Sequence, residues 1–444
     1  MRNITLKNKM KKLVKEYYKI EAQKNKKSEF ISVTGKKYDD KELWNGIEAI
    51  LKGWWTEGEY NLAFENKLKE YVGCKYAVTT NSGSSANLLA FMSLTSKKLG
   101  EKRILPGDEV ITVAACFPTT VFPIIQAEAV PVFVDVDLET YNAKVDEIKK
   151  AISPKTKAIL MAHTLGNPFQ LDEILKIKEK YDLWLIEDTC DALGSTYAEK
   201  KVGSFGDLST FSFYPAHHIT TIEGGAILTN NSLIHRIVRS FRDWGRDCWC
   251  STGKNDTCGK RFGWQLGKLP FGYDHKYIYS EIGYNLKMTD IQAAIGLAQL
   301  EKIEKFSAIR KKNFNYLKSR MIELGLDEYF ILPKQTPKSD PCWFGFILTI
   351  KDKYADLIRR NELQQYLYNN KIDSRVLFAG NITKQPVFIE NEINYKVVGN
   401  LSNTDRIMKN SLWVGIHQGL NKKHMEKIAK NIANFIYDKM RGIK

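Results

Sequence analysis

Four cysteines are spaced as metal ligands could be. Cys190 is followed by Cys248, Cys250 and Cys258 in the spacing C-x57-C-x-C-x7-C. Thiolates on an irregular loop with glycine can converge on zinc or iron, and four thiolates alone do not separate structural zinc from an iron-sulfur cluster. Seven cysteines, an odd number, without a recognisable secretion signal favour thiols or metal ligands over disulfides. The three outside this spacing are expected to pack as small apolar side chains: Cys74, Cys116 and Cys342.

A second candidate site is a turn of small polar residues. The predicted strand 76–79 leads into Asn81-Ser-Gly-Ser-Ser-Ala, which opens a helix. Hydroxyls and free N–H groups at a helix N-terminus are suited to bind a phosphate. They are equally suited to an ordinary helix cap, so this turn alone does not decide between the two.

A carboxylate ends another predicted strand. Asp188 follows Leu185-Ile-Glu, a buried position where an ionised carboxylate is costly unless a cation or a donor meets it. A protonated pyridine nitrogen would be such a partner. Residues 209–225, Ser-Thr-Phe-Ser-Phe-Tyr-Pro-Ala-His-His-Ile-Thr-Thr-Ile-Glu-Gly-Gly, then predict a strand, a polar loop and a return into another strand.

Together these segments resemble the DegT/DnrJ/EryC1/StrS sugar aminotransferase family, which uses pyridoxal phosphate on the aspartate aminotransferase-like fold type I. The resemblance runs from about residue 41 to the C-terminus. It includes Pro-Val-Phe-Val-Asp-Val-Asp at 131–137 and Gly-Tyr-Asn-Leu-Lys-Met-Thr-Asp-Ile-Gln-Ala-Ala-Ile-Gly at 283–296. Four ordered motifs in one chain make the resemblance specific.

The resemblance implies where the cofactor phosphate would bind. Gly83, Ser84, Ser85 and Ser212 would hold it, and Asn285 would reach it from the second subunit of a homodimer. The alternative for Asn285 is a helix cap.

The resemblance also implies three contacts with the cofactor ring. Phe117 would lie against the ring face, although it could instead be a core residue. Asp188 would hold the ring nitrogen protonated. Asp191 would sit near the ring hydroxyl, where the family usually has Gln.

The residue that binds the cofactor covalently in this family is missing. The family has Lys five residues after the serine, but His217 stands five residues after Ser212, and no Lys occurs between Lys201 and Lys254. Imidazole cannot form the stable covalent link of a lysine, but it moves protons near neutral pH. Either catalysis has been lost, or the reaction starts from bound pyridoxamine phosphate and needs only a base. We expect His217 to be that base and His218 to point elsewhere.

The histidine and the cysteine spacing together resemble the 3-dehydrases of this family, which act in 3,6-dideoxysugar synthesis for lipopolysaccharide O-antigen. This implies pyridoxamine phosphate, a CDP-linked 4-keto-6-deoxyhexose as substrate, and an NAD(P)H-dependent flavin and iron-sulfur reductase as electron donor. It implies a [2Fe-2S] cluster on the four spaced cysteines: Cys190, Cys248, Cys250 and Cys258. The alternatives are a dehydratase without a cluster, the same chemistry on a dTDP-sugar, and a catalytically dead redox sensor.

The elements around these residues predict an α/β fold with a mainly parallel sheet and a smaller α+β C-terminal domain. Short apolar runs alternate with helices from residue 73 onward, as in parallel sheets buried on both faces. We predict an N-terminal helical arm at 1–60, a large cofactor-binding domain at 61–305 and a small domain at 306–444. Residues 290–305 are expected to form one long amphipathic helix.

Composition excludes several other classes of protein. With 444 residues, 43% hydrophobic and 27% charged, the chain is folded rather than disordered. The net charge of +16 is spread without a basic patch interleaved with aromatics, so we expect no nucleic-acid binding. The apolar stretch 110–134 is broken by Pro118 and Pro123, so we expect no membrane span and a cytoplasmic protein.

Overall fold

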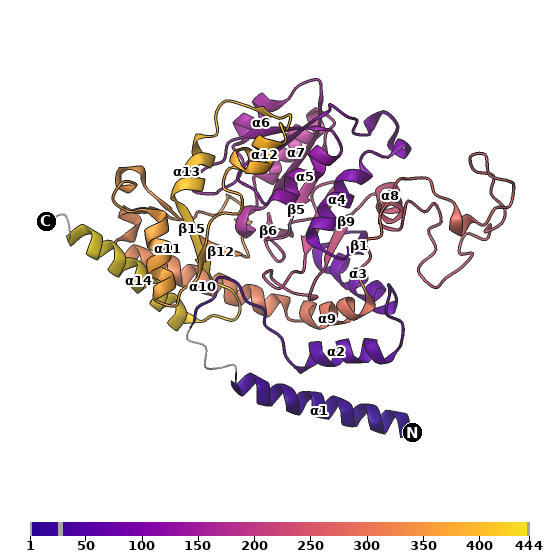
Figure 1. Ribbon diagram of the computed structural model, residues 1–444, viewed down its shortest axis with the longest axis horizontal. Helices are drawn as coiled ribbons and strands as arrows, with labels where there is room; N and C mark the ends of the chain where they lie inside the picture. The colour runs from indigo at the N-terminus through magenta and orange to yellow at the C-terminus, as the bar shows by residue number, and fades with distance from the viewer. Residues whose placement is uncertain (1, 25–29, 442–444) are drawn as a thin grey trace.

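An eight-stranded sheet forms the centre of the larger part of the protein in this computed structural model, which describes residues 2–24 and 30–441 (Figure 1). The strand order is β1-β9-β8-β5-β4-β2-β3-β14. β9 is antiparallel to both of its neighbours, and all other neighbouring strands are parallel. The mainly parallel α/β fold is therefore confirmed. The strands are β1 (Tyr76–Thr80), β2 (Glu109–Val113), β3 (Val130–Val134), β4 (Thr156–Ala162), β5 (Trp184–Asp188), β8 (Leu208–Ser212), β9 (Gly225–Thr229) and β14 (Lys396–Val397).

Helices cover both faces of this sheet, because alternate side chains of each strand point to opposite faces. Leu160 and Ile186 face a core with α4 and α8, whereas Ile159 and Leu185 face a core with α6 and α7. Burial on both faces explains why the strands are continuous apolar runs. The covering helices are α3 (Glu59–Val72), α4 (Gly83–Ser93), α5 (Pro118–Gln126), α6 (Val145–Ala151), α7 (Leu171–Lys180), α8 (Ser232–Arg242) and α9 (Asp290–Leu300).

A second, antiparallel sheet lies in the C-terminal part, in the order β10-β12-β15-β13. Its own apolar core packs against α10, α11 and α14. The division into domains at 60 and 305 stays a prediction. The elements are β10 (Phe330–Ile331), β12 (Gly345–Ile350), β13 (Ser374–Arg375), β15 (Ser411–Gly415), α10 (Ile303–Glu323), α11 (Arg360–Asn369), α12 (Pro386–Glu390), α13 (Ser402–Asn410) and α14 (Lys422–Arg441). A small three-stranded sheet joins β6 (Thr196–Tyr197), β7 (Lys200–Lys201) and β11 (Ser339–Asp340).

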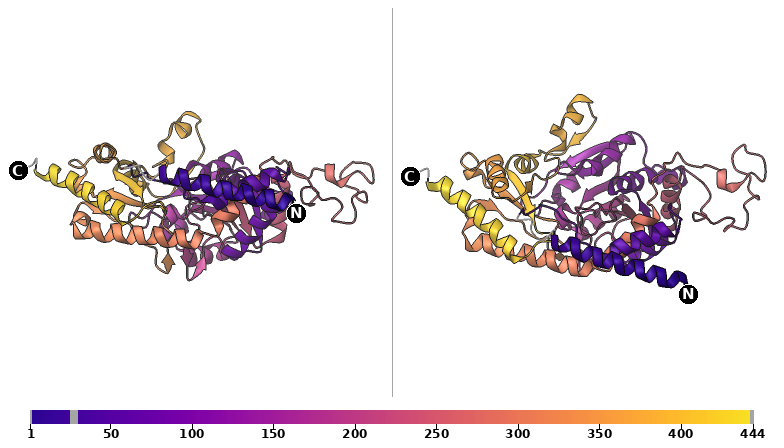
Figure 2. Two further views of the ribbon diagram at one scale, coloured as in Figure 1. Left: turned by 90° about the horizontal axis from the view of Figure 1, so that it is seen from below. Right: turned by 60° about the horizontal axis from the view of Figure 1, so that its bottom comes forward.

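The N-terminal segment forms two helices, α1 (Arg2–Lys24) and α2 (Asp40–Leu51), and α1 lies along the outside of the molecule in all three ribbon views (Figures 1 and 2). Asp39 and Glu42 form a capping box that starts α2. The single helix expected at 290–305 is two helices, α9 and α10. They meet beside Lys302, whose ammonium binds Asp39 at 2.9 Å and Glu42 at 2.6 Å.

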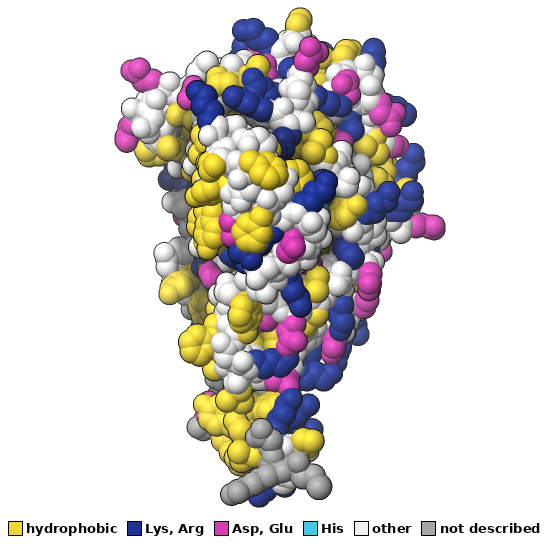
Figure 3. Space-filling model, turned by 90° about the vertical axis from the view of Figure 1, so that its right-hand side faces the viewer, with side chains coloured by type: hydrophobic (Ala, Val, Ile, Leu, Met, Phe, Trp, Pro, Cys, Tyr) yellow, Lys and Arg dark blue, Asp and Glu magenta, His cyan; other side chains and the backbone are white. Residues whose placement is uncertain are grey.

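A long segment between α8 and α9 projects from the body of the protein, at the right of Figure 1. Its only regular element is the short 3-10 helix η4 (His275–Tyr277). Figure 3 faces this end of the molecule and shows hydrophobic side chains among Lys and Arg. No helix in the described ranges has the length and apolar character needed to cross a membrane.

Candidate active site

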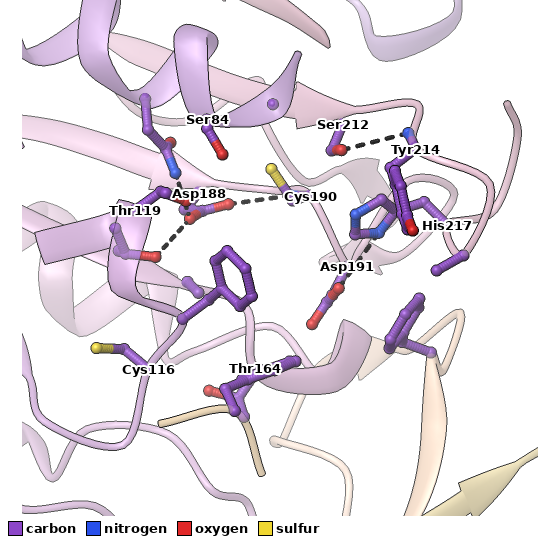
Figure 4. A pocket seen from close by; sticks show the side chains of 18 of the residues that line it. Ser84, Cys116, Thr119, Thr164, Asp188, Cys190, Asp191, Ser212, Tyr214 and His217 are labelled. Atoms are coloured by element: carbon purple, nitrogen blue, oxygen red, sulfur yellow. Dashed lines mark hydrogen bonds and ion pairs between the residues drawn. The ribbon is translucent and has the colours of Figure 1, made fainter. Parts of the chain in front are cut away.

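A cavity of about 510 Å³ lies at the carboxyl ends of the parallel strands (Figure 4). Ligands of open α/β sheets bind at this edge, where loops and helix N-termini meet. The cavity is lined by most of the residues predicted to bind the cofactor, together with the predicted base: Gly83, Ser84, Phe117, Asp188, Asp191, Ser212 and His217.

One end of the cavity has the features of a phosphate site. It is formed by the first turn of α4, where Ser82 is the N-cap and accepts from the Ser85 N–H at 3.0 Å. The first N–H groups of a helix have no acceptor within the helix, so they favour an anion. Gly83 is required here, because a Cβ at this position would lie 2.4 Å from the Ser212 Cβ.

Ser85 itself does not line the cavity. Its hydroxyl bonds to the Ser82 hydroxyl at 2.9 Å, inside the cap. Its role as a phosphate ligand stays a prediction, and Ser82, which was not predicted, lines the cavity instead.

Asp188 is held by three donors at the end of β5. Asn87 donates to its Oδ2 at 2.9 Å, Thr120 donates to the same oxygen at 2.7 Å, and the Cys190 N–H donates to Oδ1 at 3.2 Å. A carboxylate has about four acceptor positions, so one remains for a ring N–H in the cavity. The residues therefore fit a pyridine cofactor at both its phosphate end and its ring nitrogen.

Sequence analysis missed the two side chains that hold Asp188. Asn87 lies three residues after Ser84 on the first turns of α4, so helical spacing from the phosphate turn could have indicated it. Thr120 lies in the first turn of α5, and nothing in its local sequence indicates this contact.

His217 lies against Asp191 at the wall of the cavity. Its Nδ1 is 3.4 Å from Asp191 Oδ1, an ion-pair distance without the alignment of a hydrogen bond. Burial raises the pKa of Asp191, and His217 opposes that rise. The ring of Phe344, the residue before β12, lies 5.3 Å from the His217 ring. The structure thus places Asp191 beside the predicted base. Its predicted contact with a ring hydroxyl stays a prediction.

Arg310 of α10 fixes the loop that carries His217. Its buried guanidinium donates to the backbone carbonyls of Trp343, Phe344 and His217 at 3.3, 3.1 and 3.4 Å. Burial lowers the pKa of Arg310 to about 10, still far enough above neutrality to keep it charged. Because these contacts are long-range, no local sequence pattern indicates Arg310.

His218 points elsewhere, as expected. Its Nε2 donates to the Cys342 carbonyl at 2.7 Å, and the side chain is fully buried. Burial lowers the pKa of His218 well below its usual value, so it stays neutral and structural.

Phe117 and Asn285 differ in their placement. Phe117 is 51% exposed, lines the cavity and meets Phe378 edge-on at 5.9 Å, so it is not a core residue. Asn285 is exposed, does not line the cavity of its own chain and accepts from Lys287 at 2.8 Å. Its predicted contact from a second subunit stays a prediction.

The structure does not bring the four predicted metal ligands together. Cys190 lines the cofactor cavity, where burial and Asp188 raise its pKa well above the usual value. Cys248, Cys250 and Cys258 lie in the projecting segment and line a separate, small cavity. Within residues 2–24 and 30–441, no group of three or more His, Cys, Asp or Glu side chains could hold a metal ion as placed. A metal site on all four cysteines stays a prediction, because the residues as placed do not form it.

The three loop cysteines have a neighbour that sequence analysis missed. His275 lines the same small cavity, with its Nδ1 4.0 Å from Cys258 Sγ and its Nε2 2.7 Å from Asp247 Oδ2. Burial raises the pKa of Cys250, but hydrogen bonds from Thr257 outweigh it and hold that pKa below its usual value. Of the other cysteines, Cys116 and Cys342 are buried as expected, and Cys74 is half-buried.

A comparison with family models decides the family. The model described as "DegT/DnrJ/EryC1/StrS aminotransferase family" matches residues 37–433. The chain belongs to this family. The resemblance inferred from the motifs is confirmed at that level, and the chain is an enzyme.

Curated relatives cover nearly the whole chain. The chain is 55% identical over 402 residues to the lipopolysaccharide biosynthesis protein RfbH of Salmonella typhimurium, covering 90% of this chain and 91% of that protein. It is 49% identical to the dTDP-4-dehydro-2,6-dideoxy-D-glucose 3-dehydratase of Saccharopolyspora spinosa, covering 88% and 83%. It is 34% identical to the GDP-4-keto-6-deoxy-D-mannose 3-dehydratase of Escherichia coli O55:H7, covering 86% and 94%.

A solved structure shows the same fold. The chain superimposes on the E. coli GDP-4-keto-6-deoxy-D-mannose-3-dehydratase with bound hydrated PLP with a TM-score of 0.80 and 30% identity. The match covers 90% of this chain and 99% of that one. The fold is that of the fold type I enzymes of this family.

Proposed function

We propose that this enzyme uses pyridoxamine phosphate to remove the C3 hydroxyl of a nucleotide-linked 4-keto-6-deoxyhexose. The observation that carries the proposal is His217, which lines the same cavity as most of the predicted cofactor residues and occupies the position of the lysine in the family motif. Two of the relatives are named as 3-dehydratases of nucleotide sugars, which supports dehydration over amino transfer. Loss of the C3 oxygen from such a sugar, dependent on bound pyridoxamine phosphate and on His217, is the test.

The binding residues would fix the cofactor at its two ends. The first turn of α4, with Ser84, and Ser212 bind the phosphate, and Asp188 keeps the ring nitrogen protonated. Pyridoxamine phosphate, when bound, supplies an amine for the keto group and a ring that accepts electrons. Asn87 and Thr120 keep the Asp188 carboxylate in place without neutralising it, because both are uncharged donors.

His217 would move the proton that the reaction requires. Asp191 faces its Nδ1, so Nε2 is left to take a proton from the cofactor methylene and to protonate the departing hydroxyl. Arg310 donates to the His217 carbonyl, which fixes the backbone of the loop that carries the imidazole. Proton transfer needs this fixed position, because a base acts only within hydrogen-bond reach.

Restoring a lysine tests the placement of His217. We expect His217→Lys to bind pyridoxal phosphate covalently, because the new amine would stand where the family motif has its own. Reduction with borohydride followed by intact mass measurement would show one added cofactor per chain. His218→Lys is the matched control and is expected to remain unmodified, since that side chain faces Cys342. A modified His218→Lys with an unmodified His217→Lys would refute the placement.

We propose CDP as the nucleotide of the substrate. The support is the cysteine spacing, which resembles that of the CDP-sugar enzymes, whereas two relatives are named for dTDP- and GDP-sugars. We further propose a homodimer in which Asn285 reaches the partner subunit's phosphate site; its exposed position supports this.

We also propose that the cysteine loop carries the [2Fe-2S] centre and receives electrons from a flavin and iron-sulfur reductase. The spacing and the gathering of three thiols at one cavity support it. The residues as placed do not form a complete site, because Cys190 lies in the cofactor cavity. That separation favours a second candidate function, a dehydratase that needs no cluster and deaminates its product.

Iron content separates these two candidates. For the cluster enzyme we expect Cys258→Ser to lose iron, sulfide and net 3-deoxygenation while dehydration continues, since that step needs no electron donor. Anaerobic purification followed by iron and sulfide analysis measures this, with Cys74→Ser as a control outside the spacing. Wild-type protein that contains zinc or no metal would refute the cluster and leave the cluster-free dehydratase.

A further inference from the structure

The charges that line the cofactor cavity are distributed unevenly. Three carboxylates, Asp188, Asp191 and Glu223, line it, and Arg375 is the only Lys or Arg among the described residues of its lining. Asp188 and Asp191 lie on the cofactor side of the cavity, and the phosphate end relies on the α4 N-terminus rather than on a cation. An anion that binds in this cavity in addition to the cofactor phosphate would therefore have Arg375 as its one Lys or Arg partner among the described lining residues.

Arg375 lies on the part of the cavity wall that the second sheet forms. It lies at the end of β13, in register with Trp413 of β15, and both line the cavity. The Trp413 ring lies 5.3 Å from Phe344, and the Phe344 ring lies 5.3 Å from His217. Arg375 and His217 both line the cavity, and the rings of Trp413 and Phe344 connect the β13–β15 strand pair to His217 through two successive ring contacts.

The guanidinium is oriented but retains free donors. Its Nη1 donates to the Asp373 carboxylate and to the Ser374 carbonyl, the latter at 3.0 Å. Asp373 is itself fixed, because its N–H donates to the Ile31 carbonyl at 2.9 Å. Nε and Nη2 of Arg375 meet no acceptor in the described ranges, and the side chain is 57% exposed at the cavity. A fixed guanidinium with one free edge suits bidentate binding of a phosphate.

We propose that Arg375 binds the diphosphate of the nucleotide-linked substrate, at the phosphate next to the sugar. The proposal rests on the proposed function, because the sugar must place its keto carbon near His217. The anomeric phosphate then lies across the hexose ring from that carbon, toward the wall of Trp413 and Arg375. Arg375 would select sugars linked to a nucleoside diphosphate and orient them for reaction.

Binding of nucleotides without turnover tests this assignment. The full-length protein, loaded with pyridoxamine phosphate, would be titrated calorimetrically with CDP, CMP, dTDP and dTMP. We expect the wild type to bind the matching diphosphate more tightly than its monophosphate. Arg375→Gln should weaken diphosphate binding by about 10- to 100-fold and leave monophosphate binding nearly unchanged, since one charge-assisted contact is lost. Arg375→Lys should fall between, because it keeps the charge without the fork.

Two controls make the outcomes distinct. Lys384→Gln removes a cation nine residues away that pairs with Asp405 and does not line the cavity, and it should bind as the wild type does. Unchanged affinity for pyridoxamine phosphate in Arg375→Gln would show that the cavity is intact. Diphosphate binding by Arg375→Gln equal to that of the wild type overturns the assignment and leaves the proposed function standing. A wild type that binds none of the four nucleotides overturns the assignment together with the proposed CDP substrate, whereas dehydration at C3 is judged by the fate of the C3 oxygen.

Discussion

Replacing His217 by Asn is expected to abolish proton exchange at the methylene of bound pyridoxamine phosphate. The phosphate and ring-nitrogen contacts come from α4, Ser212 and Asp188, which the substitution does not touch, so the cofactor should still bind. The proton acceptor is lost, and a positioned general base contributes about 10²- to 10⁴-fold. Exchange of the methylene hydrogens with deuterated solvent, followed by mass spectrometry of the released cofactor, measures the effect.

A matched control separates the base from histidine in general. His424 lies in the first turn of α14 and does not line the cavity, so His424→Asn should exchange at the wild-type rate. Exchange in His217→Asn within a few fold of the wild type, at full cofactor occupancy, would show that another group takes the proton.

The second large effect is expected for Asp188→Asn. The amide keeps the size of the side chain but cannot hold the ring nitrogen protonated, and its NH₂ would face the donors of Asn87 or Thr120. A hydrogen bond to a charged group contributes about 1.5–3 kcal/mol, so affinity for pyridoxamine phosphate should fall roughly 10- to 100-fold. Methylene exchange should slow further, because the electron-accepting ring loses its positive charge.

Equilibrium dialysis and absorbance of the bound cofactor measure these changes. Asp146→Asn, an exposed carboxylate on α6, is the control and should match the wild type. Thr120→Val removes one donor from Asp188 and should give a smaller loss. Wild-type affinity in Asp188→Asn would place the ring nitrogen elsewhere.

Much of the fold could be predicted from the sequence, because strands and helix starts are determined by residues that are neighbours in the chain. Apolar runs buried on both faces, such as β2 and β5, and the Ser-Gly turn before α4 each depend on neighbouring residues. The same motifs led to Asp188, Ser212 and His217, which the structure brings to one cavity. Their roles with a cofactor stay predictions.

Contacts between segments far apart in the chain could not be predicted from the sequence. Arg310 meets His217 across 93 residues, and Arg375 joins the cavity only because the second sheet packs beside the first. The cysteine spacing indicated one metal site, but it does not determine where the 57 residues between Cys190 and Cys248 run in the fold. The loop with Cys248 projects outward while Cys190 stays on the cofactor side.

Dehydration at C3 with His217 as base is tested by following the C3 oxygen. The enzyme would be incubated with pyridoxamine phosphate and a CDP-linked 4-keto-6-deoxyhexose labelled with ¹⁸O at C3, and the sugar and water analysed by mass spectrometry. We predict release of the label into water that depends on the cofactor and is lost in His217→Asn. A sugar that keeps its C3 label and gains a 4-amino group would show an aminotransferase and refute dehydration at C3.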